Sequence, residues 1–190
     1  MTVCQRVSAL TPALVVRDCE PRDLACVLLL ASEFHAVNRE LAPEDYTPTF
    51  DPSGADAMMR EAMLAGDQIL AVAELAGLVV GYVWGQVMSR PRSAFRPGAR
   101  FLFVSQVYVA TWARRKGLCA ALLGFIAGDA VKHGATEVLL DVVTSNDGAA
   151  DAFRAAGFKP STLIMRSEVP VFATLSHTHS PSGPADQSSP

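Results

Sequence analysis

The sequence predicts an α/β (α+β) fold in which a mixed sheet is flanked by helices, with the element order β-α-α-β-β-β-α-β-α-β. Residues 101–131 carry most of this prediction, because a strand-like run rich in Val, Phe and Tyr passes through a basic turn into apolar residues at helical spacing. A second observation is a pair of strand-like runs on either side of Ala76-Gly77, which indicates a hairpin. No internal repeat is visible, so we expect one domain over residues 1–173.

The first half of the chain should supply a strand, two helices and the hairpin. Residues 14–17 are a short apolar strand signal, and the segment after them repeats apolar residues at helical spacing. Pro43 and Pro48 bracket an irregular connection, after which Asp51 and Pro52 introduce a second helix. The expected elements are a strand at 14–17, helices at about 21–37 and 54–65, and strands at 69–74 and 78–88.

The second half should add the central strand, two helices and two further strands. Gly134 ends the first of these helices, and the run after it is almost continuously apolar, as in a buried parallel strand. Ser145 or Asn146 is a suitable N-cap for the second helix. The expected elements are strands at 101–109, 138–143 and 158–167, a helix at 118–133 and a short helix after residue 146.

Composition limits the partners and the compartment. Half of the 190 residues are apolar and 18% are charged, and the net charge of −3 gives no general attraction to nucleic acid. No apolar run approaches the ~20 residues that span a bilayer. We therefore expect a cytoplasmic protein without nucleic-acid or membrane partners. Residues 174–190 are almost free of apolar side chains and should form a disordered tail.

The cysteines show no paired C-x-x-C spacing, so we expect reduced thiols and neither disulfides nor a metal site. They are Cys4, Cys19, Cys26 and Cys119.

The turn between the central strand and the helix at 118–133 is a candidate phosphate site. The first N–H groups of a helix have no partners within the helix and carry partial positive charge. Arg114, Arg115 and Lys116 add full charges, and Gly117 lets a ligand approach the backbone. Neither G-x-x-x-x-G-K-[ST] nor G-x-G-x-x-G is present, which excludes the two common nucleotide-binding loops.

The spacing of this turn resembles the acetyl-CoA loop of the GNAT superfamily of N-acetyltransferases, whose pattern is [QR]-x-x-G-x-[GA]. Arg114 and Gly117 match it, and Cys119 departs from it at the last small position. The run from Asn146 to Phe158 also matches a family block, N-x-x-A-x-x-x-[YF]-x-x-x-G-F, at every position. With the hairpin before the central strand, the resemblance spans roughly residues 14–167.

This resemblance implies a largely antiparallel sheet, acetyl-CoA as co-substrate and a primary amine as acceptor, either a small molecule or a protein amine. It implies no metal, and a monomer or homodimer. The family holds the pantetheine arm on the central strand, here at the backbone of Val107 and Val109, and the N–H of Val109 is a candidate oxyanion donor. The expected cofactor contacts are Val107, Tyr108, Val109, Arg114, Arg115, Lys116, Gly117, Leu118, Cys119, Ala120, Asn146 and Phe153.

The catalytic residues are left open by the sequence. Many family members carry a Glu base on the central strand, but residues 101–109 contain no carboxylate. Phe153 stands where many members have a Tyr that protonates the leaving thiolate. A catalytically weak acetyl-CoA sensor or regulatory domain is therefore the alternative to an enzyme. A nucleic-acid-binding module is a third interpretation, which the lack of a broad basic patch disfavours.

The acceptor side is expected at the first two helices and their connection, by analogy with the family. Its candidate contacts are Glu33, His35, Asn38, Glu40, Glu44 and Asp45, for which a solvated helix face is the simpler interpretation; no role is assigned to His35. The loop at 91–98, with Arg90, Arg92, Arg96 and Arg100 in or beside it, is interpreted as a solvent loop in preference to a lid over CoA or an acidic substrate.

Overall fold

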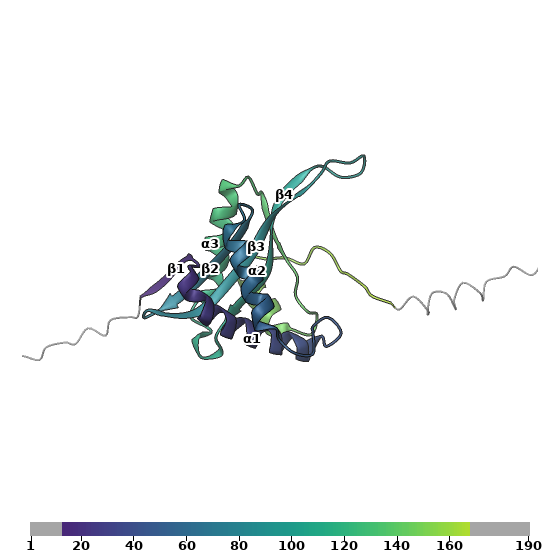
Figure 1. The fold of residues 1–190 in the computed structure, drawn as a ribbon. Coiled ribbons are helices and arrows are strands. Elements are labelled where there is room, and N and C mark those ends of the chain that lie inside the picture. The colour runs from purple at the N-terminus through teal and green to yellow at the C-terminus, as the bar shows by residue number, and fades with distance from the viewer. Residues whose placement is uncertain (1–12, 168–190) are drawn as a thin grey trace, which may run out of the picture. The chain divides into compact units, whose positions relative to one another are not determined.

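The structure is a computed structural model that describes residues 13–167. The chain divides into two units, residues 1–157 and 158–190, and all the helices and strands of the described residues belong to the first (Figure 1). The expected tail at 174–190 and Cys4 lie outside the described residues, as does the expected domain boundary at residue 173.

Five strands form one sheet in the order β1-β2-β3-β4-β5. The first four pair antiparallel and β5 joins β4 in parallel, which confirms the mixed, largely antiparallel fold predicted from the sequence. Ala76 and Gly77 form the tight turn between β2 and β3, both with positive φ. The strands are β1 (Leu14–Asp18), β2 (Gln68–Leu75), β3 (Leu78–Arg90), β4 (Ala99–Val109) and β5 (Glu137–Leu140).

The helices lie close to their predicted positions. Asp51 caps α2 by accepting a hydrogen bond from the N–H of Gly54, and Gly134, with φ of 78°, follows the end of α3. Within residues 13–167, no helix combines the length and the apolar character that crossing a membrane requires. The helices are α1 (Leu24–Leu41), α2 (Pro52–Leu64), α3 (Leu118–Lys132) and α4 (Asp147–Ala155), with 3-10 turns η1 (Pro21–Asp23) and η2 (Thr111–Ala113).

The two faces of the sheet carry different helices. A side chain at Gly81 or Gly85 of β3 would meet Leu122 or Ile126 of α3 within 3.3 Å, so these glycines let α3 pack closely on that face. The side chain of Tyr108 on β4 instead meets Phe34 of α1, with the ring centroids 6.4 Å apart. Successive strand residues point to opposite faces of a sheet. The face that carries the side chains of Gln106 and Tyr108 is therefore the one that α1 and α2 cover.

Near the end of the described residues, the structure differs from the prediction in the length of one strand and in the absence of another. The strand expected at 138–143 stops at Leu140 and is an edge strand of the described sheet, half-exposed rather than buried. The strand expected at 158–167 does not form. Pro160 removes a backbone donor near its start, and the apolar run 163–165 is too short to impose the alternation that a strand requires.

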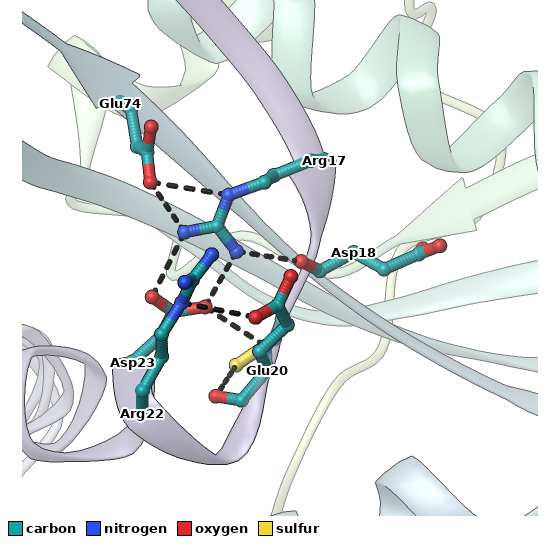
Figure 2. Close-up of polar contacts among 7 residues, drawn as sticks. Arg17, Asp18, Glu20, Arg22, Asp23 and Glu74 are labelled. Carbon is teal, nitrogen blue, oxygen red and sulfur yellow. Dashed lines mark hydrogen bonds and ion pairs between the residues drawn. The ribbon is translucent and has the colours of Figure 1, made fainter. Parts of the chain in front are cut away.

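A partly buried ion cluster joins the first strand to the rest of the sheet (Figure 2). The guanidinium of Arg17 on β1 donates two hydrogen bonds to the carboxylate of Asp23, at 2.6 and 2.9 Å, and also donates to Glu74 on β2. Asp23 additionally accepts from the N–H of Glu20 at 2.8 Å and is only 5% exposed. The hydrogen bonds from Arg17 hold the pKa of Asp23 below its usual value.

Replacing Arg17 by Met should destabilise the fold by about 2–3 kcal/mol, because it leaves the carboxylate of Asp23 buried without its cation. The pKa of Asp23 is lower in the folded protein than the unfolded value of ~3.9. The ionised Asp23 therefore adds to the free energy of unfolding above the unfolded pKa, and this stabilisation is lost as the pH falls through the folded pKa. Urea unfolding of Arg17→Met should thus show a smaller loss between pH 7 and pH 3 than the natural protein shows. Equal pH dependence in both proteins would contradict this account. The control is Arg60→Met, which removes an exposed ion pair with Asp56 on α2.

Candidate active site

The parallel strands β4 and β5 stop pairing before β4 ends. Pairing runs from Phe101 with Glu137 to Val104 with Leu140, whereas β4 continues to Val109. The pairing of β4 with β3 shifts register at the same place, so that Ser105 is an extra, bulged residue. A bulge bends and twists its strand, which explains why β5 does not follow β4 further. The last part of β4 therefore has one edge that no described strand covers.

The backbone of Val107 and Val109 faces this uncovered edge. The N–H of Ala110 donates to the carbonyl of Val80 at 2.8 Å, and hydrogen-bonded pairs alternate along an antiparallel ladder. Tyr108 and Gln106, opposite Tyr82 and Trp84, thus exchange bonds with β3, whereas Val107 and Val109 point their polar groups away from it. This is the arrangement that an extended ligand needs in order to pair with β4 as a strand would.

The turn after β4 has an unusual backbone. Arg115 and Gly117 both adopt left-handed conformations, with φ of 61° and 79°. An L-residue such as Arg115 is disfavoured there by roughly 1–2 kcal/mol. Gly117 is the N-cap of α3, no described side chain caps the helix, and a Cβ built on Gly117 would have no atom within 4 Å. There is consequently open space beside Gly117 at the N-terminus of α3, where the first N–H groups have no partner within the helix.

Two of the basic residues of the turn, Arg114 and Lys116, contact aromatic rings. Nε of Arg114 donates to the carbonyl of Val109 at 3.0 Å, and its guanidinium carbon lies 5.3 Å from the ring centroid of Tyr108. The ammonium of Lys116 lies 5.8 Å from the ring centroid of Trp112. Arg114 therefore supports the end of β4, and it leaves the N–H of Val109 as the outward-facing polar group of that residue.

Cys119 suits the place where the family pattern has Gly or Ala. It is half-buried in the first turn of α3, and burial raises the pKa of its thiol, so it acts as a small neutral side chain. Burial likewise raises the pKa of Cys19 to about 12. Cys19, Cys26 and Cys119 are all free, as expected for the described cysteines.

The two expected cofactor residues beyond β5 lie on or next to α4. Oδ1 of Asn146 accepts a hydrogen bond from the N–H of Ala149 at 3.1 Å, which confirms it as the helix cap. Phe153 is half-buried on the same helix, which has no fully buried residue.

On the opposite face, a carboxylate reaches the end of β4 from α1. The hydroxyl of Tyr108 donates to Oε2 of Glu33 at 3.1 Å, and Glu33 is itself exposed to solvent. The sequence marked Glu33 as one of six acceptor-side candidates but gave no reason to prefer it. The signal that distinguishes it is the contact with Tyr108, which lies 75 residues away in the chain.

Beside this pair lies a pocket of about 190 Å³ between α1, α2 and the sheet. Phe34 and His35 line it from α1, Met59 from α2, Trp84 from β3 and Gln106 from β4. The structure thus places His35, to which the sequence assigned no role, in a pocket wall.

The other acceptor-side candidates lie elsewhere. Asn38 is buried, and its side-chain amide donates to the carbonyl of Phe34 at 2.9 Å, so it stabilises α1. Glu40, Glu44 and Asp45 are exposed on the end of α1 and on the connection after it. The loop at 91–98 forms the tip of the β3–β4 hairpin, where every residue is exposed.

These features together define a class of protein. The sheet is mostly antiparallel, and β4 has an uncovered edge that leads into a basic helix start without a side-chain cap. Such an arrangement is able to hold an extended phosphate-bearing cofactor. The pocket on the other face offers a second substrate access to the same strand. This combination is that of a cofactor-dependent group transferase.

Comparison with known proteins gives the family. The sequence profile of the Acetyltransferase (GNAT) family matches residues 35–158, and the chain belongs to this family. It is by class an acetyl-CoA-dependent acetyltransferase that transfers an acetyl group to an acceptor. None of the curated proteins matches the sequence.

Solved structures share the fold at low sequence identity. The tetramutant of the BH1408 protein from Bacillus halodurans has a TM-score of 0.71 at 17% identity, over 82% of this chain and 99% of that one. The aminoglycoside N-acetyltransferase AAC(6')-Iy, in complex with CoA, has a TM-score of 0.63 at 14% identity, over 83% and 95%. A transcriptional regulator from Bacillus halodurans C-125 has a TM-score of 0.66 at 16% identity, over 82% and 99%.

Proposed function

We propose that this protein is an N-acetyltransferase that moves the acetyl group of acetyl-CoA to a primary amine by direct attack in a ternary complex. The observation that carries the proposal is the uncovered edge of β4 at Val107 and Val109, next to the turn that ends at Gly117. The edge supports the pantetheine arm, and the N–H groups of residues 117–120 support the pyrophosphate. Asn146 and Phe153 remain proposed cofactor contacts on α4.

The chemistry needs a polarised thioester and a neutral amine. When bound, acetyl-CoA supplies the acetyl group: its C–S bond breaks as the amine nitrogen forms the C–N bond, and the thiolate takes a proton from solvent. The N–H of Val109 stabilises the developing oxyanion. Glu33 accepts the proton of the attacking amine, directly or through the hydroxyl of Tyr108. The base thus comes from α1, and β4 itself needs no carboxylate.

The alternative is an acetyl-CoA sensor with little catalysis. The absence of a carboxylate on β4 and of a hydroxyl at Phe153 supports it, and one structural neighbour is described as a transcriptional regulator. A neighbour that acetylates aminoglycosides supports the enzyme, with an aminoglycoside as one acceptor class to test.

One experiment separates the two functions. Calorimetry measures acetyl-CoA binding, and a thiol reagent measures CoA release in the presence of a panel of primary amines. We expect saturable binding together with amine-dependent thiol release. Tight binding of acetyl-CoA without thiol release for any amine would favour the sensor. A lack of acetyl-CoA binding would contradict the proposal that the edge of β4 at Val107 and Val109 holds the cofactor.

A further inference from the structure

We propose that the pocket between α1, α2 and the sheet receives a ring-sized apolar group of the acceptor, so that the preferred substrates are primary amines joined by a short link to an apolar body. This inference rests on the proposed acetyl transfer and specifies its acceptor. It is carried by the lining of the pocket, by the way its polar atoms are already used, and by its distance from the reactive end of β4.

The lining of the pocket is almost entirely apolar or aromatic. Phe34, Tyr46 and Trp84 contribute rings, and Met59, 1% exposed, closes the floor from α2. None of the described lining residues carries a carboxylate. Burial raises the pKa of Tyr46, which therefore offers no negative charge. Nothing in this lining neutralises a buried ammonium group, and burying an unpaired charge is expensive.

Three polar atoms of the lining are bound to other side chains. Oε1 of Gln106 accepts from the hydroxyl of Tyr82 at 2.7 Å, and Nε1 of Trp84 donates to Gln68 at 2.9 Å. Nε2 of His35 lies 3.1 Å from Oγ1 of Thr47. These three atoms are therefore already paired, and most of the remaining lining that a ligand can cover is apolar or aromatic.

The size of the pocket sets the size of the group. An apolar cavity of about 150 Å³ binds benzene, and this pocket measures about 190 Å³. A single aromatic ring or a short branched alkyl group therefore fits, whereas a sugar ring would bring several hydroxyl groups into a lining that is mostly apolar.

The position of the pocket sets the length of the link. Gln106 lines the pocket, and Tyr108, which holds Glu33, is two residues further along the same face of β4, roughly 6–7 Å away. The ring of Phe34 lies between the two, because it both lines the pocket and contacts Tyr108. An amine two or three bonds from the apolar group thus reaches Glu33 and the backbone at Val109 while the group stays in the pocket.

The first test compares acceptors that all carry a primary amine but differ in the body to which it is attached. We expect kcat/KM for 2-phenylethylamine to exceed that for spermidine and for the aminoglycoside neamine by at least tenfold. The opposite order would overturn the inference while leaving acetyl transfer intact. Saturable calorimetric binding of 2-phenylethylamine to the protein should accompany it. Acetylation of other amines without such binding would also overturn it.

The second test fills the pocket without touching the cofactor side. Ala55 is a half-buried lining residue on α2, and Ala57 is exposed on the same helix outside the lining. Ala55→Phe should raise KM for 2-phenylethylamine at least tenfold and leave KM for acetyl-CoA unchanged, whereas Ala57→Phe should match the natural enzyme. Equal behaviour of the two variants, at equal melting temperature, would contradict the proposal.

A third variant guards against misfolding of Ala55→Phe. Met58 lines the rim of the pocket and is 58% exposed, so its truncation should not disturb the core. Met58→Ala should shift the preference toward 2-(1-naphthyl)ethylamine by about fivefold relative to 2-phenylethylamine. An unchanged ratio would count against a role of this pocket in acceptor choice.

Discussion

Acetyl-CoA binding should be lost, by at least 100-fold in Kd, when Gly117 is replaced by Val. A valine side chain would occupy the open space in front of the first N–H groups of α3 and would also disfavour the left-handed conformation that presents them. Each 1.4 kcal/mol of lost interaction is tenfold in affinity, so two impaired N–H contacts to a charged group suffice for this loss. Calorimetric titration with acetyl-CoA measures it directly.

The chain offers a matched control at the other end of the same helix. Gly134 has φ of 78°, against 79° for Gly117, and a Cβ there would meet only Arg100 at an ordinary 3.7 Å. Gly134→Val therefore carries the same backbone strain, roughly 1–2 kcal/mol, without approaching the proposed phosphate site. Similar losses of acetyl-CoA affinity in both variants would show that backbone strain causes the effect. They would contradict the proposal that the turn at Gly117 binds the cofactor.

Replacement of Glu33 by Gln should lower kcat by about 100-fold, within the 10²–10⁴-fold that general base catalysis contributes. Gln is nearly isosteric, and its amide oxygen still accepts from the hydroxyl of Tyr108, so the end of β4 keeps its geometry. KM for acetyl-CoA should not change. The deficit should shrink as the pH rises toward the ~10.4 at which an alkylamine loses its proton in solution.

The control for this variant is Glu61→Gln, an identical change of charge at an exposed position of α2. It should leave kcat as it is. A Glu33→Gln enzyme with natural kcat at pH 7 would exclude Glu33 as the base. A water chain would then have to remove the proton from the amine. A pH-independent deficit would point instead to a role of Glu33 in positioning Tyr108.

The backbone of the proposed acetyl-CoA turn was predictable because its determinants are local. Gly117 and the basic residues before it adjoin a strong helical pattern, and a left-handed glycine at a helix start is set by a few neighbouring residues. The same holds for the cap at Asn146 and the hairpin at Ala76-Gly77. Local conformations of this kind depend on a few consecutive residues. The sequence alone was therefore enough to predict the succession of elements through α4 and the family resemblance.

Where strands end is set less locally. The run at 138–143 is apolar except for Asp141 and resembles a strand throughout, but its pairing ends at Leu140, beside the bulge at Ser105 on its neighbour. The run at 158–167 likewise formed no strand. A strand exists only where a partner continues to supply hydrogen bonds, and the shape of that partner is not encoded in the strand's own residues.

The acceptor side was decided by tertiary structure. Glu33 is one of several acidic residues on and after α1, and only the packing of that helix on the sheet brings its carboxylate to Tyr108. The pocket draws side chains from α1, α2, β3, β4 and the connection between the helices. By itself the sequence determined the order of elements through α4 and the backbone of the proposed cofactor turn, since both depend on neighbouring residues. The proposed base and the proposed acceptor pocket depend on distant residues that meet only when the apolar faces of the helices are buried against the sheet.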